Sequence, residues 1–302
     1  MEGSSRSRDR RVPVVKIGSM CLIWWSNSRG RTAIACKLNG QPALPDTLAI
    51  PTIVLYAVSH RSQVRAVNVT IVDFVRRRLV YALSDLGKGR ECLFCGWEGS
   101  EFRPRLNPRK PSADSYCPKC GSLERHRLGY FALRSKLKDL QSTLHFAPEK
   151  PIEKWLRSIS RRYVSCDLEP GLAMEVEDIT KLSYSDESFE FIWCSNVLEH
   201  VPDDRAAFSE LRRVLTKGGT CVVAVPIWRR KTYEDPTVTT PESRIEKFGQ
   251  IDHVRLYGFD IEDRLKAAGF NVEMITARDF DPRDVGRYGL NHLTTGELFV
   301  CT

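Results

Sequence analysis

The chain has 302 residues, of which 42% are hydrophobic and 28% charged, a composition typical of proteins that bury a sizeable core in water. Residues 1–68 carry ten Lys or Arg against three acids, so the net charge of +8 leaves only +1 on the other 234 residues. This near-neutral remainder argues against a nucleic-acid partner, and no apolar run approaches the roughly 20 residues of a membrane-spanning helix.

Residues 1–66 show no sustained hydrophobic period, and we expect a basic, poorly ordered N-terminal segment; a small domain is the alternative. An apolar helical stripe from Val69 to Leu83 predicts a helix that packs on the module after it. No secretion signal is visible, so we expect a cytoplasmic protein. We expect residues 67–140 to form a unit of this helix, a zinc-ribbon-like module and a linking helix.

Four of the ten cysteines form two Cys-x-x-Cys-Gly turns, with 21 residues between them. Each turn directs two thiolates at one point, so the pair of turns predicts a tetrahedral zinc site made of Cys92, Cys95, Cys117 and Cys120. Four thiolates leave no position for water, which indicates a structural ion. Two unrelated reduced pairs, or a redox pair, are the alternatives.

A short charged segment, Gly121 to Arg127, follows the second turn directly. Ser122 is a candidate cap for a helix that runs to about Leu140. Arg125 to Arg127 either line an anionic cleft, such as the approach to a cofactor carboxylate, or form the exposed start of that helix.

Residues 141–302 alternate between apolar strands and amphipathic helices, which predicts an α/β fold with a mostly parallel sheet covered on both faces. The expected strands are 142–149 (with its loop), 163–167, an apolar run at 191–194 that stops at Ser195, 220–226, 272–276 and 297–301, and the expected helices are 205–215 and 257–268. Lys217-Gly218-Gly219 is expected to end the first of these helices.

From Leu144 to Cys301 the chain resembles class I S-adenosylmethionine (SAM) methyltransferases, of the type 11-like group. The segment 189–201 ends in Val-Leu-Glu-His-Val, similar to the fourth strand and loop of that family. A narrower resemblance is to a subgroup with a four-cysteine module and these motifs: Cys-Pro-x-Cys-Gly-Ser-Leu-Glu-Arg-His-Arg (117–127), Leu-His-Phe-Ala-Pro-Glu (144–149), Thr-Tyr-Glu-Asp-Pro (232–236) and Phe-Gly-Gln-x-Asp-His-Val-Arg (248–255). The resemblance implies a doubly wound, mostly parallel seven-stranded Rossmann-like sheet, and SAM as the methyl donor.

By position, the resemblance places eight residues beside SAM: His145, Ala147, Glu149, Asp167, Asp178, Ile179, Ser195 and Asn196. Asp167 suits the ribose because one carboxylate accepts hydrogen bonds from both hydroxyls. Asp178 and Ile179 suit the adenine amine and ring. The family's Gly-rich first turn is absent: His145 stands where an acid is usual, and Ala147 and Glu149 stand where glycines are.

The acceptor side is expected in the loops 226–241 and 250–255, after the fifth strand and before the next helix. His253 is the candidate general base, oriented by Asp252 or Glu234. Arg255 and Tyr233 are candidate substrate-binding residues. The alternative is a buried polar network that only holds the loop in place.

We therefore predict an enzyme that transfers a methyl group to an O or N of a small-molecule or saccharide acceptor. An RNA methyltransferase that grips RNA with the ribbon is possible but not favoured, because the ribbon lacks interleaved aromatic and basic residues. A non-catalytic SAM-fold binding protein is the third reading. The sequence predicts no membrane partner and gives no oligomeric state.

Overall fold

The structure, a computed structural model, describes residues 87–105, 112–229, 231–291 and 296–302, together with the backbone of five strands within residues 14–70. Its contacts divide the chain into two units, Met1–Leu83 and Ser84–Thr302. Among the described residues, no helix has both the length and the apolar content that a membrane crossing requires.

The strands of the first unit are more regular than the sequence led us to expect. Three form an antiparallel sheet: β1 (Val14–Ile17), β2 (Met20–Ser26) and β3 (Thr32–Lys37). Two form a hairpin: β4 (Thr52–Val58) and β5 (Val64–Thr70). The helix expected from Val69 lies mostly outside the described residues, and its first two residues belong to β5.

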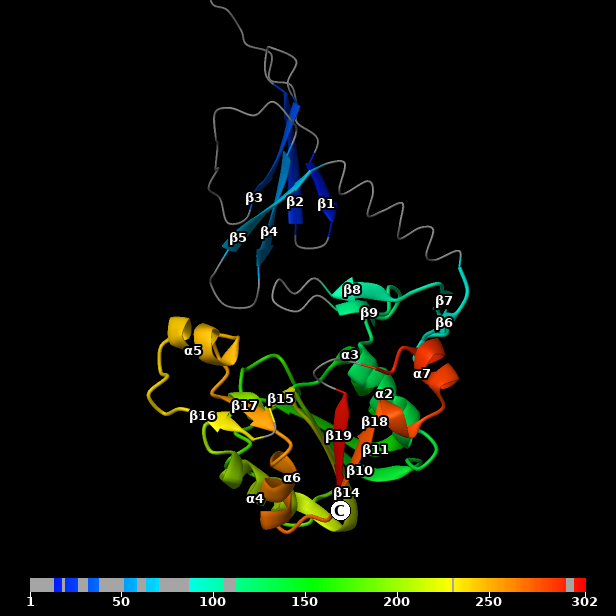
Figure 1. Ribbon diagram of the computed structural model, residues 1–302, viewed down its shortest axis with the longest axis vertical. Helices are drawn as coiled ribbons and strands as arrows, with labels where there is room; N and C mark the ends of the chain where they lie inside the picture. The colour runs from blue at the N-terminus through cyan, green and yellow to red at the C-terminus, as the bar shows by residue number, and fades with distance from the viewer. Residues whose placement is uncertain are drawn as a thin grey trace, which may run out of the picture. The chain divides into compact units, whose positions relative to one another are not determined.

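The second unit is built on a seven-stranded sheet in the order β12-β11-β10-β13-β14-β19-β18. Its strand β19 is drawn in red in Figure 1. Its strands are β10 (Leu140–Phe146), β11 (Ser160–Asp167), β12 (Glu175–Val176), β13 (Phe189–Ser195), β14 (Leu215–Ala224), β18 (Val272–Thr276) and β19 (Glu297–Cys301). The five strands from β12 to β14 are parallel, whereas β19 runs antiparallel to both of its neighbours. This confirms the predicted doubly wound, mostly parallel sheet.

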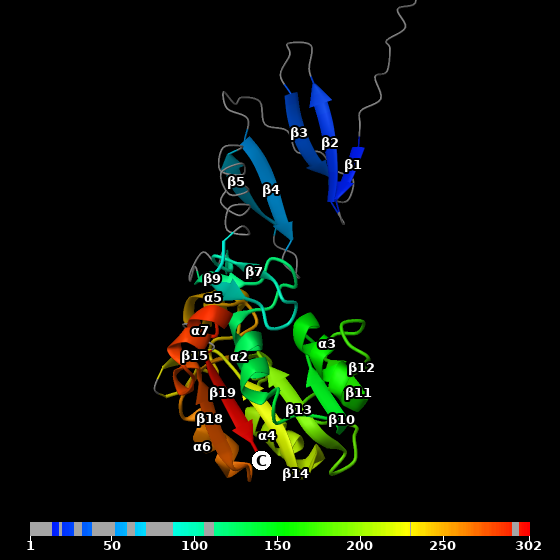
Figure 2. The same ribbon diagram turned by 90° about the vertical axis from the view of Figure 1, so that its right-hand side faces the viewer.

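Alternate residues of the central strands enter two separate cores, one on each face of the sheet. Ile192 and Cys194 of β13 pack with α4 (Asp204–Val214) and α6 (Ile261–Ala267). Phe191 and Trp193 pack on the other face with α2 (Glu124–Leu133) and α3 (Lys150–Ile159). Both helices are labelled in Figure 2. Burial on both faces explains why β13 is a nearly continuous apolar run.

Helix α2 lies very close to the sheet at Gly129. An ideal Cβ on Gly129 would lie 2.3 Å from the Cη2 atom of Trp193, which is 1% exposed. Only a glycine therefore permits this approach, at a cost of about 1 kcal/mol in helix propensity. The close packing fixes the depth of α2, which carries Arg125 and His126.

The cysteine module contains two short hairpins, β6 (Arg90–Glu91) with β7 (Glu98–Gly99) and β8 (Arg103–Arg105) with β9 (Ser112–Tyr116). Arg127 connects this module to the end of α7 (Pro282–Tyr288). Its buried guanidinium donates to four backbone carbonyls, those of Ser115, Ser122, Tyr288 and Gly289. The module and the large sheet consequently form one unit.

A small sheet, β15-β17-β16, follows the carboxyl end of β14. Its strands are β15 (Ile227–Arg229), β16 (Tyr233–Glu234) and β17 (Arg255–Gly258), and α5 (Pro241–Phe248) lies between the last two in sequence. The loops 226–241 and 250–255 are thus partly regular structure.

Three local predictions were wrong. Tyr257 lies in β17, and the helix expected there begins at Ile261. Ser122 does not cap α2, whose N-cap is Leu123; its hydroxyl instead lies 3.2 Å from the Cys92 sulfur. The glycines at 218 and 219 belong to β14, because α4 has already ended at Val214.

Candidate active site

Two neighbouring strands, β10 and β13, end in left-handed backbone. Phe146 pairs with both Cys166 and Cys194, so β10, β11 and β13 end at the same edge of the sheet. Directly after these ends, Ala147 has φ +47° and Asn196 has φ +56°. A non-glycine residue pays roughly 1 kcal/mol or more for this conformation. Ala147 thus adopts the turn that a glycine would make easily, although the Gly-rich motif is missing.

Glu149, after the end of β10, is held by two side chains of α2. Arg125 forms an ion pair with it, and His126 Nε2 lies 2.8 Å from its Oε1. Burial alone would raise the pKa of Glu149, but His126 and Arg125 together lower it to about 2. His126 Nδ1 accepts the Leu123 amide, which fits a neutral ring with its proton on Nε2. Arg125 and His126 are therefore buried at the strand end and are not an exposed helix start.

His145, the residue in place of the usual acid, is fully buried on β10. Its Nδ1 lies 2.8 Å from the hydroxyl of Tyr163. Burial lowers the pKa of His145 to about 3, so the ring is neutral. It can offer a hydrogen bond but no charge to a ligand.

Several buried polar atoms near these strand ends have no hydrogen-bond partner among the described residues: Arg125 Nε, His145 Nε2, Glu149 Oε2, Glu199 Oε2 and His253 Nδ1. The groups are electrostatically linked, since Glu149 acts on His145 and Arg125 acts on Glu199. Each unpaired buried polar group costs about 1–3 kcal/mol, so such a concentration indicates a polar ligand. SAM, with its amine, carboxylate and ribose hydroxyls, has the chemistry to fill it.

Asp167 ends β11 and Asp178 follows β12, as the sequence suggested. Asp167 Oδ1 accepts the Glu169 amide at 2.9 Å, and Asp178 Oδ1 accepts the amide and hydroxyl of Thr180. These local turns fix both carboxylates near the ends of the parallel strands. Both remain accessible to a ligand, because Asp167 is half-buried and Asp178 exposed.

Ile179 does not offer its side chain to a ligand, because it is 6% exposed and packs in the core with α4. The large apolar side chains that are exposed here are Leu168, Leu172, Met174 and Val176. Leu168, which directly follows Asp167, is 71% exposed and could cover an adenine ring. Sequence reasoning missed it, although its position beside the acid is the signal that would have found it.

Beyond β13, a polar cluster forms around the short helix η1 (Leu198–His200). Ser195 is buried beside Asn196, whose side-chain amide donates to Glu199 Oε1 at 3.2 Å. Burial raises the pKa of Glu199 to about 7. The rings of His200 and His253 lie 4.7 Å apart, and burial lowers the pKa of His253 to about 4.

The structure does not bring the proposed base and its orienting acids together. Asp252 pairs with His200, at 3.3 Å, and Glu234 pairs with Arg255 Nε at 2.6 Å and with Arg264. Neither acid therefore pairs with His253.

Arg255 is 4% exposed and donates to the backbone carbonyls of Leu198, Val201 and Pro202. It holds η1 against β17, which is the network that we gave as the alternative. Tyr233, the other proposed substrate contact, is half-buried, with its ring 5.8 Å from that of Phe248.

The four cysteines of the module converge as predicted. The sulfurs of Cys92 and Cys120 lie 3.5 Å apart, and those of Cys95 and Cys117 lie 3.6 Å apart. A tetrahedron with Zn–S bonds of about 2.3 Å has edges of about 3.8 Å, so a zinc ion fits, whereas disulfide sulfurs would be about 2.05 Å apart. The glycines of both turns have positive φ, as these tight turns require.

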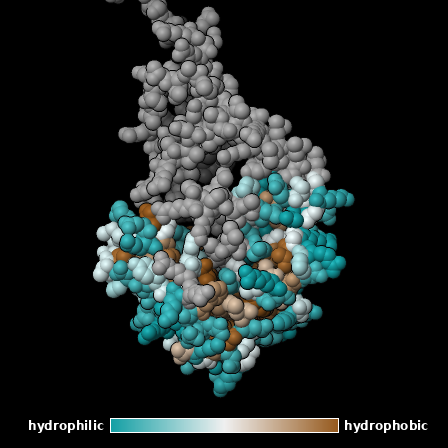
Figure 3. Space-filling model, viewed as in Figure 1, coloured by the Kyte–Doolittle hydropathy of each residue, from teal (hydrophilic) through white to brown (hydrophobic). Residues whose placement is uncertain are grey.

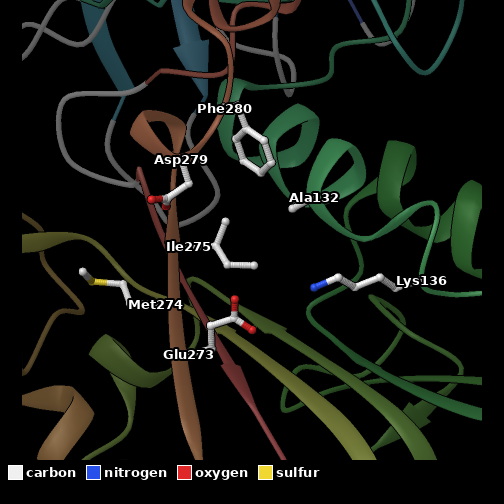
Figure 4. Close-up of a pocket in the computed structure, with 7 residues that line it drawn as sticks. All are labelled: Ala132, Lys136, Glu273, Met274, Ile275, Asp279 and Phe280. Carbon is white, nitrogen blue, oxygen red and sulfur yellow. The ribbon is translucent and has the colours of Figure 1, made fainter.

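A hollow of about 310 Å³ lies elsewhere, at the edge strand β18 (Figure 4). It is lined by Ala132, Lys136, Glu273, Met274, Ile275, Asp279 and Phe280. None of these is among the residues predicted to bind SAM, metal or acceptor. Figure 3 shows that hydrophilic residues dominate the described part of one face, with smaller hydrophobic patches among them.

Known proteins resemble this chain in part. Residues 150–223 match the family model described as "Methyltransferase domain". An uncharacterized 37.1 kDa protein in transposon TN4556 of Streptomyces fradiae is 37% identical over 67 residues, which are 22% of this chain and only 19% of that protein.

Solved structures are similar to part of this chain at low identity. An S-adenosylmethionine dependent methyltransferase from Mesorhizobium loti is 18% identical, with a TM-score of 0.42, over 58% of this chain and 96% of the other. A putative methyltransferase in complex with the Trm112 methyltransferase activator, from Haloferax volcanii, is 19% identical, with a TM-score of 0.42, over 59% and 89%. Residues 150–223 thus match a methyltransferase domain model, and the strand order is that of a mostly parallel, Rossmann-like sheet.

Proposed function

We propose that this protein is a SAM-dependent methyltransferase that acts on an O or N of a small-molecule or saccharide acceptor. The observation that carries the proposal is the set of buried, unpartnered polar atoms at the ends of β10 and β13, beside Asp167 and Asp178. In a methyltransferase domain, this is where a donor with both a charged and a nucleoside end would lie.

The residues present fit SAM along the ends of three strands. Arg125 Nε can donate to the donor's carboxylate, and Glu149 Oε2 can accept from its amine. Asp167 can accept from both ribose hydroxyls, Asp178 from the adenine amine, and Leu168 can cover the ring. SAM, when bound, supplies a methyl group activated by its sulfonium.

The chain's own task is to align the acceptor and to exclude water. The groups available for the acceptor are Glu199, His200 and His253, whose ligand atoms lie within 4.8 Å of one another. Arg255 is excluded from this role, because its guanidinium is buried among backbone carbonyls. Asp252 contributes by positioning His200.

The four-cysteine site is proposed to hold a structural zinc ion. This proposal is supported by the hydrogen bonds of Arg127, whose guanidinium donates to carbonyls of both the module and the end of α7. A module held in this way serves to position α2, and hence Arg125. The near-neutral charge of residues 69–302 also favours a small acceptor over RNA.

The test is methyl transfer from SAM labelled in its methyl group, with the purified protein in a metabolite extract and, separately, in total RNA. Label in a small-molecule fraction, lost with Asp167→Ala, is the expected result. Label in RNA would show that the acceptor is RNA and not a small molecule. No transfer, together with no binding of SAM, would reject the proposed activity.

A further inference from the structure

Three side chains at the end of β13 are arranged like metal ligands. Glu199, His200 and His253 each offer one ligand atom, and these atoms all lie within 4.8 Å of one another. Glu199 and His200 come from η1, whereas His253 comes from the segment before β17. Two imidazole nitrogens and one carboxylate oxygen form a donor set that binds divalent transition metals in proteins.

Two of the three side chains are oriented by a second group. The amide of Asn196 donates to one oxygen of Glu199, and Asp252 lies 3.3 Å from Nδ1 of His200. Such outer partners fix the ring orientation and tautomer of metal-binding histidines.

The atoms left over point to a missing ion. Glu199 Oε2 and His253 Nδ1 are buried and have no hydrogen-bond partner among the described residues. Glu199 is 2% exposed and His253 3% exposed. A simple hydrogen-bonded network would have paired two such close groups with each other. A cation satisfies both lone pairs at once, whereas their burial without one is costly.

We propose that Glu199, His200 and His253 bind one divalent transition-metal ion, and that this ion holds an oxygen of the methyl acceptor. The ion is separate from the one at the four-cysteine site. The role of the ion rests on the proposed methyltransferase function, but its binding does not. Three protein ligands leave coordination positions open for substrate.

The acceptor class follows from this site. A hydroxyl bound to the ion loses its proton to solvent more easily, because the metal lowers its pKa. The resulting oxygen forms the new O–CH₃ bond as the S–CH₃ bond of SAM breaks, and S-adenosylhomocysteine leaves as a neutral thioether. The acceptor is therefore a hydroxyl compound.

The experiment uses the full chain with its cysteine site already filled by zinc, and Co²⁺ as the probe. Equilibrium dialysis measures the bound Co²⁺, and absorption spectra report whether thiolate is a ligand. We expect one Co²⁺ per chain without a sulfur-to-metal charge-transfer band. Glu199→Gln and His253→Gln should each weaken binding by 100-fold or more, and Asp252→Asn by about 10- to 100-fold.

Glu242→Gln, on the exposed face of α5, is the matched control and should bind as the wild type does. If a site variant fails to fold, X-ray absorption of wild-type Co²⁺ protein still decides, since the proposal requires nitrogen and oxygen ligands without sulfur. No Co²⁺ beyond the cysteine site, or unchanged binding in both site variants, would overturn it. SAM binding is measured separately, so a bound metal without SAM binding would reject the methyltransferase proposal alone.

Discussion

Ala147, directly after the end of β10, has a backbone conformation that can be tested by substitution. Its φ of +47° is a conformation that favours glycine. We expect Ala147→Gly to raise the free energy of unfolding by up to about 1 kcal/mol, because it relieves this strain. Ala147→Val should lower it by more than 1 kcal/mol, because a β-branched residue is least tolerant of positive φ. Denaturant titration of both variants checks this, and the reverse order would contradict the described turn.

Glu149 makes stability depend on acid pH. Its pKa falls from 4.5 in the unfolded chain to about 2 in the folded one, so the ionised group stabilises the fold above pH 4.5. This stabilisation, at most about 3 kcal/mol, is lost as the pH falls from 4.5 toward 2.

The check is denaturation of wild type and Glu149→Gln from pH 7 to pH 3. The difference between their unfolding free energies should shrink over the lower part of that range. Glu246→Gln, on the surface of α5, is the control and should leave the wild-type profile unchanged. A difference independent of pH would show that Glu149 is not ionised beside Arg125.

At this scale, the sequence could predict chemistry but not pairing. The positions of Asp167 and Asp178 at strand ends, and the convergence of the four cysteines, were predictable because a strand end or a Cys-x-x-Cys turn fixes where its own side chains lie. The partner of His253 was not predictable. Asp252 is adjacent in sequence, yet it turns to His200, and the choice depends on how η1 packs against β17.

The close contact between helix α2 and the sheet can be tested at Gly129. We expect Gly129→Ala to lower the free energy of unfolding by about 1–3 kcal/mol, since the new methyl group would overlap the buried ring of Trp193. Gly286→Ala in α7 is the matched control, because an added Cβ there meets nothing within 4 Å. It should be neutral or raise stability by up to about 1 kcal/mol.

Thermal and denaturant unfolding of the two variants provide the comparison. Equal effects of both substitutions would contradict the close packing of α2 on β13. If Gly129→Ala shifts α2 without unfolding the chain, SAM binding should weaken as well, because Arg125 moves with the helix.

Elements with regular hydrophobic patterns were predictable, and those formed by long-range packing were not. The strands at 272–276 and 297–301 were confirmed to the residue. Both contain β-branched residues, which favour strands. Tyr257 was assigned to a helix because its apolar neighbours fit that period. In the folded chain it pairs in β17, and its hydroxyl donates to Asp204 of α4.

Two arginines connect the cysteine module to the rest of the unit Ser84–Thr302. Arg127 joins the two parts, and Arg287 of α7 adds an ion pair to Glu91 of β6. We therefore expect zinc removal by a chelator to lower the melting temperature of the methyltransferase domain, not only to unfold the module. Calorimetry before and after chelation checks this; an unchanged domain transition would show that the module is dispensable.

Arg127→Lys should weaken the same connection, because a single ammonium cannot bond four carbonyls.

The most direct test of the proposed function is calorimetric titration with S-adenosylhomocysteine and SAM. The wild type should bind one equivalent per chain, and Asp167→Ala should weaken binding at least 10-fold, because it removes the carboxylate assigned to the ribose. Asp263→Ala, on the exposed side of α6, should bind as the wild type does. Failure of the folded wild type to bind either nucleoside, or unchanged binding by Asp167→Ala, would contradict the SAM site proposed at the ends of β10, β11 and β13.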